Sequence, residues 1–240
     1  MKLLDVIFPK KCINCRKFGE YICQSCIAKI EYSDNYSCPV CLRPSVNGMT
    51  HNGCLKRGKI DGVVSITNYN NISKKLIFRL KYPPFLKDLA VIISDLLIEG
   101  LIQNESFYKF LEDNNPVIIP IPLSKNRFRE RGYNHAELIS YYVAQYFKLE
   151  LNTKLLNRTK DTKPQYKLNK LERIKNLENA FEISEIYKNS QNLSSSWRIP
   201  ESVILVDDIA TSFETLNKAC HELKRNGVKK VLGVTFAREV

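Results

Sequence analysis

Two adjacent aspartates, Asp207 and Asp208, directly follow an apolar run in the segment 202-SVILVDDIATSFETL-216. Carboxylates at the end of a buried strand are costly unless a ligand or hydrogen-bond donors meet them, and the vicinal hydroxyls of a ribose are such donors. Small hydroxyl residues come next, and a helix is expected after Phe213. Hydroxyls and free N–H groups at a helix start suit a phosphate. The segment therefore predicts a sugar-phosphate site, in which three side chains offer hydroxyl groups: Thr211, Ser212 and Thr215.

A purely structural role is the alternative for these residues. Asp208 would then cap the end of the strand, and Thr211 or Ser212 would be the N-cap of the helix. A single aspartate would not distinguish the two interpretations. Two adjacent carboxylates followed by three hydroxyl residues favour the ligand site.

Seven of the eight cysteines fall before residue 55, in a series of closely spaced pairs. The pairs are 12-CINC-15, 23-CQSC-26 and 38-CPVC-41, followed by 51-HNGC-54. A two-residue gap lets both side chains of a tight turn reach one metal ion, so four pairs suffice for two tetrahedral zinc ions. Disulfides are the alternative, but thiols in a reducing cytoplasm stay free. The segment is also too short to bury a large core, so metal would supply its folding energy.

Two pairings of these ligands are possible, successive or crossed. We prefer the successive one because each site then closes within a short loop. It joins Cys12, Cys15, Cys23 and Cys26 in one site, and Cys38, Cys41, His51 and Cys54 in the other. Four protein ligands leave no open position, so both sites are expected to be structural or nucleic-acid-facing. Cys220 stands apart and is expected to be a buried core thiol.

The charge of the chain is strongly basic, with a formal net charge of +12 and a pI near 9.3. Such a balance favours polyanionic partners. The excess is concentrated in residues 72–87 and 154–175, although a generally solvated basic surface would account for part of it. The side chains expected to contact nucleic acid are Lys74, Lys75, Arg79, Lys163, Lys167 and Lys170.

The length and hydropathy of the chain limit the class of protein. With 240 residues and 44% hydrophobic content it can build a core, which excludes wholesale disorder. The segment 3-LLDVIF-8 is too short for a signal peptide, and 89-LAVIISDLLIEGLI-102 contains two acids, which argues against a membrane span. We therefore expect a cytoplasmic protein.

After residue 60, short apolar runs alternate with helical patterns. Strands are expected at 63–69, 117–122, 151–156, 203–206 and 230–237, and helices at 86–102, 134–147, 165–179 and 214–226, with a polar loop at 188–198. The alternation predicts an α/β fold with a parallel sheet and right-handed crossovers. Ligands of such sheets bind beyond the carboxyl ends of the strands. The chain is thus divided into a zinc module, 1–59, and an α/β domain, 60–240.

The segment 203-VILVDDIATSFETL-216 resembles the phosphoribosyl pyrophosphate (PRPP) loop of type I phosphoribosyltransferases, whose pattern is Asp-Asp-x-x-Thr-Thr-Gly-x-Thr after an apolar strand. The chain as a whole resembles the ComF/ComFC competence proteins, which join a double zinc ribbon to a phosphoribosyltransferase-like domain. Other segments that carry the resemblance are 3-LLDVIFPKKCINC-15, 79-RLKY-82, 119-IPIPLSKNRFRERGYNHAEL-138 and 162-TKPQYKLNKLERIKNLENAF-181. The implied fold is a type I phosphoribosyltransferase-like parallel sheet flanked by helices, with a small N-terminal zinc-ribbon module.

The resemblance also implies roles for individual residues. Asp207 and Asp208 would hold the ribose of PRPP, and Lys81 would lie near the pyrophosphate together with the turn at 120–123. Magnesium would be held mainly through the ligand. The 5-phosphate would be bound by Ala210, Thr211, Ser212, Phe213, Glu214 and Thr215. The mobile segment that closes over PRPP would contribute the leaving-group arginines Arg127, Arg129 and Arg131.

Three departures from the family pattern fall in the expected site, and the first two weaken it. Phe213 stands where the pattern has glycine, and a non-glycine residue with positive φ costs about 1–2 kcal/mol. Proline follows Tyr82 where the family has a residue and then glycine. His135 replaces the usual glutamine and is expected to start a helix rather than to act as a base.

The resemblance implies a protein that handles incoming single-stranded DNA in natural transformation, together with competence helicase or translocase proteins. Aromatic residues within the basic segments suit base stacking. The alternative is an active phosphoribosyltransferase that uses PRPP and an unknown acceptor. The zinc module and the basic surface favour the first function, and the paired aspartates favour the second.

Overall fold

The computed structural model describes residues 9–34, 36–160, 180–188 and 198–239. Its centre is a four-stranded sheet with the order β1-β6-β5-β2. The strands are β1 (Gly62–Asn68), β2 (Val117–Pro120), β5 (Ser202–Ala210) and β6 (Lys230–Arg238), and all neighbouring pairs are parallel. The predicted α/β fold with a parallel sheet is therefore confirmed.

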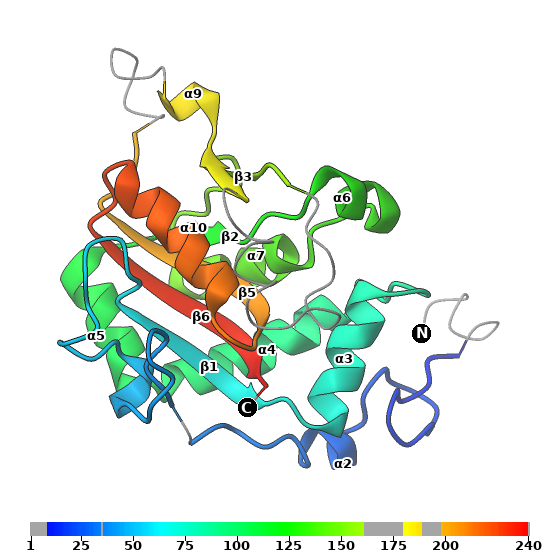
Figure 1. Ribbon diagram of the computed structural model, residues 1–240. Helices are drawn as coiled ribbons and strands as arrows, with labels where there is room; N and C mark the ends of the chain where they lie inside the picture. The colour runs from blue at the N-terminus through cyan, green and yellow to red at the C-terminus, as the bar shows by residue number, and fades with distance from the viewer. Residues whose placement is uncertain (1–8, 35, 161–179, 189–197, 240) are drawn as a thin grey trace.

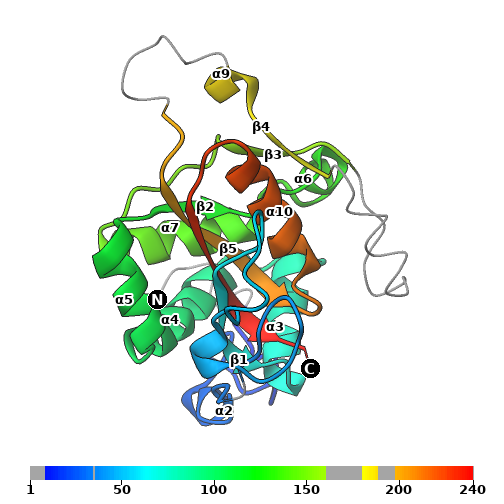
Figure 2. The same ribbon diagram turned by 60° about the vertical axis from the view of Figure 1, so that its left-hand side comes forward.

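Helices cover both faces of this sheet (Figure 1). On one face lie α3 (Asn71–Lys81), α4 (Leu89–Ile102) and α7 (His135–Phe147), and on the other lies α10 (Glu214–Arg225). Figure 2 shows the sheet between α7 and α10. Successive residues of a strand point to opposite faces, so Ile204 packs beneath α4 and α7 whereas Leu205 packs beneath α10. This alternation explains why 203-VILV-206 is continuously apolar.

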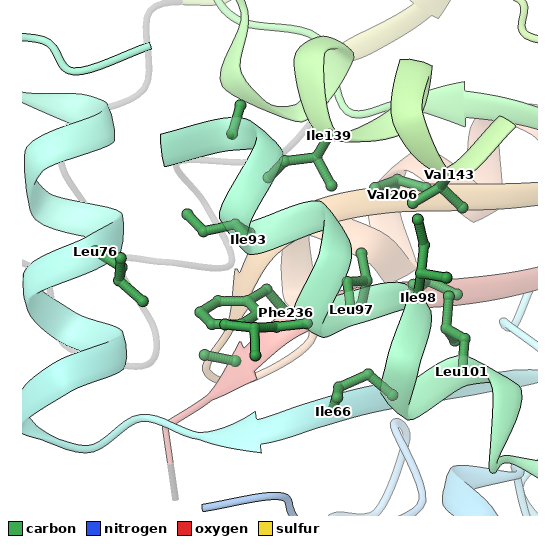
Figure 3. Close-up of a cluster of buried hydrophobic side chains, with 14 of the residues drawn as sticks. Ile66, Leu76, Ile93, Leu97, Ile98, Leu101, Ile139, Val143, Val206 and Phe236 are labelled. Atoms are coloured by element: carbon green, nitrogen blue, oxygen red, sulfur yellow. The ribbon is translucent and has the colours of Figure 1, made fainter. Parts of the chain in front are cut away.

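The larger core cluster lies between the sheet and the first group of helices (Figure 3). Ile93 and Leu97 of α4 and Ile139 of α7 meet Phe236 of β6 there, and all four side chains are at most 1% exposed. Helix α4 is buried along most of its length because α7 also packs on it. Tyr142 and Tyr146, which the sequence groups with Leu138 on one side of α7, lie on its exposed face.

The remaining elements are short. They are α2 (Gln24–Ile27), a 3-10 turn (Val46–Gly48), α5 (Glu105–Asn114), α6 (Lys125–Arg131) and α9 (Glu185–Lys188), with an antiparallel pair formed by β3 (Leu156–Arg158) and β4 (Phe181–Ile183). The strand expected over 151–156 is reduced to one bridge between Leu151 and Ile118, because the regular pairing of β3 starts only at Leu156. The helix expected at 165–179 and nearly all of the loop expected at 188–198 lie outside the described residues.

Side-chain caps fix the first residues of two helices, α3 and α7. Asn70 accepts hydrogen bonds from the backbone of Ile72 and Ser73 and completes a capping box that begins α3, a helix the sequence patterns did not predict. Asn134 accepts from the backbone of Ala136 and donates to the carbonyl of Ile121, which ties the start of α7 to the residue after β2. At the far end of α10, Gly227 has a φ of +110°, as expected of a helix stop.

The N-terminal residues pack directly on the sheet. Ser33 donates its backbone N–H to Ile66 at 2.7 Å, and Thr50 donates to Asp61 at 2.9 Å. Cys12 and Cys26 also belong to the larger core cluster. The boundary at 59/60 remains a prediction. Within the described ranges, every helix is too short or too polar to cross a membrane.

Candidate functional site

The eight predicted metal ligands form two compact clusters. The ligand atoms of Cys12, Cys15, Cys23 and Cys26 lie within 4.8 Å of one another, and so do those of Cys38, Cys41, His51 and Cys54. This grouping confirms the successive pairing and overturns the crossed one. All of these cysteines are free thiols, which overturns the disulfide alternative.

The geometry of the donors suits tetrahedral zinc. Ligands at about 2.3 Å from the metal stand about 3.8 Å apart, and the sulfur atoms of Cys15 and Cys23 are separated by 3.5 Å. In the second cluster, Cys41 Sγ lies 3.4 Å from His51 Nδ1. His51 Nε2 lies 3.0 Å from the carbonyl of Pro44, and an N–H donated there leaves Nδ1 unprotonated for the metal. The two sites are thus of the four-cysteine and three-cysteine, one-histidine types.

A cavity of about 610 Å³ opens at the carboxyl ends of β2 and β5, where the sequence placed the ligand. It brings together residues that are far apart in the chain. Its polar lining includes Lys74, Lys81, Arg127, Arg131, His135, Arg158, Asp207, Asp208, Thr211, Glu214 and Thr215. Most of the predicted sugar-phosphate residues therefore converge on one site.

Asp208 is the electrostatic centre of this cavity. Its carboxylate is 1% exposed and forms an ion pair with Lys81 at 2.7 Å. His135 Nε2 lies 3.5 Å from the other carboxylate oxygen. Burial alone would raise the pKa of Asp208, but Lys81 and His135 outweigh it and hold that pKa well below its usual value. Asp208 is therefore a fixed anion whose oxygens already have cationic and donor partners.

Asp207 behaves in the opposite way. Burial and the neighbouring charge of Asp208 raise the pKa of Asp207 to about 7. Its Oδ1 accepts the backbone N–H of Asp208 at 2.9 Å. At neutral pH this carboxyl group is divided between its two protonation states, so it can either accept from or donate to a ligand hydroxyl.

His135 is a member of this site that the sequence interpretation missed. It does begin α7, as expected, but its side chain is buried and turned toward the aspartates. Burial lowers the pKa of His135, against the opposing effect of Asp208, which favours the neutral ring. Its Nδ1 accepts from Arg131 Nη1 at 3.0 Å, so Nε2 carries the proton and faces Asp208. The spacing in the sequence could have indicated this, because His135 lies on the same buried face of α7 as Ile139 and Val143.

The loop between β5 and α10 has a residue with positive φ at the position where the family pattern has glycine. Phe213 has a φ of 57° and a ψ of 4°, the left-handed conformation that glycine adopts freely. Its side chain is only 3% exposed and belongs to the smaller core cluster, with the Arg238 guanidinium 4.9 Å from the ring centre. Phe213 occupies the N-cap position of α10 without a side-chain hydrogen bond, which overturns the alternative in which Thr211 or Ser212 caps this helix.

The loop side chains face two different cavities. Thr211 and Thr215 line the large cavity, whereas Ser212 lines a second cavity of about 360 Å³ behind the loop. Glu214 borders both, and Ala210 and Phe213 form part of the wall of the first. The three hydroxyl groups therefore do not converge on one point.

The mouth of the large cavity is basic and aromatic. Phe78 and Tyr82 of the α3 end stack with their ring centres 4.8 Å apart, and Phe78 is 49% exposed. The guanidinium of Arg131 lies 5.5 Å from the ring centre of Tyr82. Lys74 and Arg127 line the cavity beside them. This arrangement combines cations with an exposed stacking face.

Three other described residues that were predicted to bind nucleic acid or to act in catalysis do not line the large cavity: Lys75, Arg79 and Arg129. Lys75 donates to Asn14 of the zinc module at 2.9 Å, and Arg79 donates to the carbonyl of Pro83 at 3.4 Å. Arg129 is exposed on α6 and does not line the large cavity. Lys163, Lys167 and Lys170 fall outside the described residues.

Cys220 is fully buried in α10, which confirms a core thiol, and burial raises its pKa to about 12.

Comparison with known proteins adds independent findings. Residues 3–55 match the family model of the double zinc ribbon domain. The chain is 28% identical to competence protein ComFC of Bacillus subtilis, over 88% of this chain and 81% of that protein. It is 25% identical to DNA utilization protein YhgH of Escherichia coli K12, over 93% and 94% of the two chains. It is also 33% identical to competence protein F of Haemophilus influenzae, over 48% of this chain and 46% of that protein.

The similarity to ComFC and to YhgH covers most of the chain, and the match to the double zinc ribbon includes the ligands of both metal clusters. These comparisons confirm the predicted resemblance to the ComF/ComFC competence proteins.

Proposed function

We propose that this protein handles single-stranded DNA during natural transformation, and that its large cavity binds a ribose 5-phosphate group such as that of PRPP. The names of the relatives, competence protein and DNA utilization protein, support a role in DNA uptake or use. The observation that carries the proposal is one cavity in which a carboxylate pair and a hydroxyl-bearing loop adjoin a basic, aromatic mouth. The proposed place of action is the cytoplasmic face of the membrane.

The ribose would be bound mainly by Asp207. Asp208 already has Lys81 and His135 as partners, so its free capacity to accept hydrogen bonds is small. Asp207 borders the cavity with a carboxyl group that can accept from a ribose hydroxyl. A magnesium ion would be held chiefly by ligand oxygens, because Lys81 already neutralises the stronger acid.

The phosphate would lie at the start of α10. Thr211 and Thr215 line the cavity there, and the backbone N–H groups of the first helical turn favour an anion. Arg127 and Arg131 border the same space and would neutralise a pyrophosphate. Glu214 also borders this cavity, and its carboxylate would repel the phosphate. The expected affinity for PRPP is therefore lower than in a site with glycine and uncharged residues at these loop positions.

Single-stranded DNA would bind across the mouth. An exposed ring such as Phe78 can stack on a base only where the base is unpaired, which favours single strands over duplexes. Cations at Lys74 and Arg127 would contact the phosphates. The basic residues at 154–175 are proposed to extend this surface.

The test is fluorescence anisotropy with a labelled single-stranded oligonucleotide, its duplex, and a salt series. Affinity for the single strand should exceed that for the duplex and fall tenfold or more between about 50 and 200 mM salt. Neutralising Lys163, Lys167 and Lys170 together should flatten the salt dependence. The proposal is wrong if the single strand does not bind at low salt, or binds independently of salt.

Active phosphoribosyl transfer is the second candidate, favoured by Arg127 and Arg131 at the cavity. In such a reaction the ribose–pyrophosphate bond breaks, an acceptor nitrogen bonds to the ribose, and arginines with magnesium stabilise the departing pyrophosphate. Release of pyrophosphate from PRPP in the presence of free purine and pyrimidine bases would support it. Binding of PRPP without release would leave the cavity as a binding site only.

A further inference from the structure

A hydrogen bond connects the second metal cluster to the helix that follows the phosphate loop. Asn217 Nδ2 donates to the backbone carbonyl of Pro39 at 2.8 Å. Pro39 lies between two ligands of the cluster, Cys38 and Cys41. Asn217 lies in the first turn of α10, where its own N–H bonds to the carbonyl of Phe213 at 2.9 Å. One side chain thus links the metal-binding turn to the end of the loop.

A cavity lies behind the loop, and the hydrogen bond between Asn217 and Pro39 joins one wall of this cavity to the other. The second cavity, of about 360 Å³, lies between the metal-binding turn and α10. Pro39 and Val40 form one wall, and Ser212 and Asn217 belong to the other. Ser212 Oγ and Asn217 Oδ1 are buried without a hydrogen-bond partner among the described residues. Cavities therefore border the loop on both sides, and Phe213 is the loop side chain that packs into the core.

The far end of α10 is held in a different way. Lys224 forms an ion pair with Asp61 at 2.6 Å. The backbone of Gly58 also passes close to His221, since a Cβ atom at Gly58 would lie 2.9 Å from that ring. Residues 58 and 61 follow the last ligand of the cluster, Cys54. The C-terminal half of the helix therefore has polar anchors of its own. At the N-terminal half, Asn217 adds a polar link to the zinc module beside the buried side chains of Phe213 and Leu216.

We propose that the second zinc site positions the phosphate loop through Asn217, so that zinc in this site strengthens ribose 5-phosphate binding in the large cavity. The inference rests on the proposed ribose 5-phosphate site. Zinc bound to Cys38 and Cys41 fixes the turn and thus the direction of the Pro39 carbonyl. The hydrogen bond transmits that fixed geometry to the start of α10. Asn217 is a positioning residue, because it touches neither the ligand nor the metal.

The first test uses the protein without ligand. Hydrogen exchange is measured on the zinc-loaded full chain for the amides of residues 211–217. Asn217→Ala should speed exchange of these amides about three- to tenfold, the effect of one lost hydrogen bond. Asn226→Ala is the matched control, because the Asn226 side chain bonds to Glu222 of the same helix. Equal exchange in wild type and Asn217→Ala would overturn the proposal.

The second test uses reciprocity between the two sites. If zinc strengthens ligand binding, then the ligand must strengthen zinc binding by the same factor. Ribose 5-phosphate should therefore raise the zinc affinity of the wild-type second site, measured by equilibrium competition with a chromophoric chelator, and this increase should vanish in Asn217→Ala. The wild-type measurement alone remains informative if the variant does not fold.

The outcomes separate this inference from the proposed function. Calorimetry that shows ribose 5-phosphate binding while zinc affinity is unchanged would contradict the coupling and leave the proposed site intact. An absence of binding by calorimetry would contradict the proposed ligand, and the exchange experiment would then decide whether Asn217 still orders the loop. In a supportive result, Asn217→Ala binds ribose 5-phosphate about three- to tenfold more weakly than Asn226→Ala.

Discussion

Lys81 at the end of α3 and Asp208 at the end of β5 form an ion pair of 2.7 Å in which the carboxylate is 1% exposed. The pair leaves the two neighbouring aspartates with opposite properties. Asp208 is held as an anion, whereas Asp207 carries a pKa raised to about 7 by burial and by the charge of Asp208. The ion pair thus decides which carboxyl group is available to a ligand.

Stability should fall as the pH rises through neutrality, because of Asp207. The folded state binds a proton on Asp207 more tightly than the unfolded chain, whose pKa is about 4. This contribution is fully present below that value and is lost as the pH rises through about 7. Asp208 has a lowered pKa, so its contribution is lost only in acid and does not enter this range.

The experiment is urea unfolding of zinc-loaded protein from about pH 6 to about pH 8.5. Asp207→Asn should reduce the loss of stability across this range by about 1–3 kcal/mol, since the amide does not titrate. Asp113→Asn, at an exposed position of α5, is the control and should retain the wild-type pH dependence. An unchanged slope in Asp207→Asn would contradict the proposed protonation of this group.

Zinc content should be two ions per chain. Each cluster offers four ligand atoms within 4.8 Å of one another, which suits one tetrahedral ion. Elemental analysis of purified protein should find close to two, and Cys38→Ser should lose one. Cys220→Ser should keep both, because Cys220 is buried in α10 and belongs to neither cluster. A folded wild-type protein free of zinc would refute this prediction.

Phe213 should lower the stability of the fold through its backbone conformation. Its φ of 57° is strained for a non-glycine residue by about 1–2 kcal/mol. Phe213→Gly and Phe213→Ala both remove the ring from the cavity wall and the core, but only glycine relieves the strain. The glycine variant should therefore be more stable than the alanine variant by about 1–2 kcal/mol in urea unfolding.

Ligand affinity provides the second measurement for Phe213. By calorimetry, Phe213→Gly should bind PRPP about five- to a hundredfold more tightly than wild type, because the backbone can approach the phosphate more closely. Loss of the buried ring should at the same time lower the stability of both variants. If wild type already binds as tightly as the glycine variant, the loop accommodates the phosphate with Phe213 in place.

Base stacking should depend on Phe78. Phe78→Ala should weaken binding of single-stranded DNA by about 1–3 kcal/mol, the usual contribution of one stacked base. The salt dependence should stay unchanged, because no phosphate contact is lost. Tyr146→Ala is the matched control, since Tyr146 is a 55% exposed aromatic on α7 outside the cavity. Equal loss in both variants would contradict a specific stacking site.

Local chemistry allowed the sequence to determine the metal ligands and the positions of the main strands along the chain. A two-residue gap between cysteines brings both thiols to one ion whatever surrounds them, so Cys12 and Cys15 could be assigned from spacing alone. The apolar run before Asp207 likewise identifies a strand buried on both faces, and it places the carboxylates at the ligand-binding edge of the sheet.

Only the tertiary structure decided which charged groups surround Asp208 and which cavity each hydroxyl residue of the loop lines. Lys81, His135 and Asp208 are widely separated in sequence, and their contact depends on how α3 and α7 pack on the sheet. Similarly, only the packing of α10 shows that Ser212 faces a different cavity from Thr211. Such contacts depend on distances between elements that no local pattern encodes, because burial and charge act through space and not along the chain.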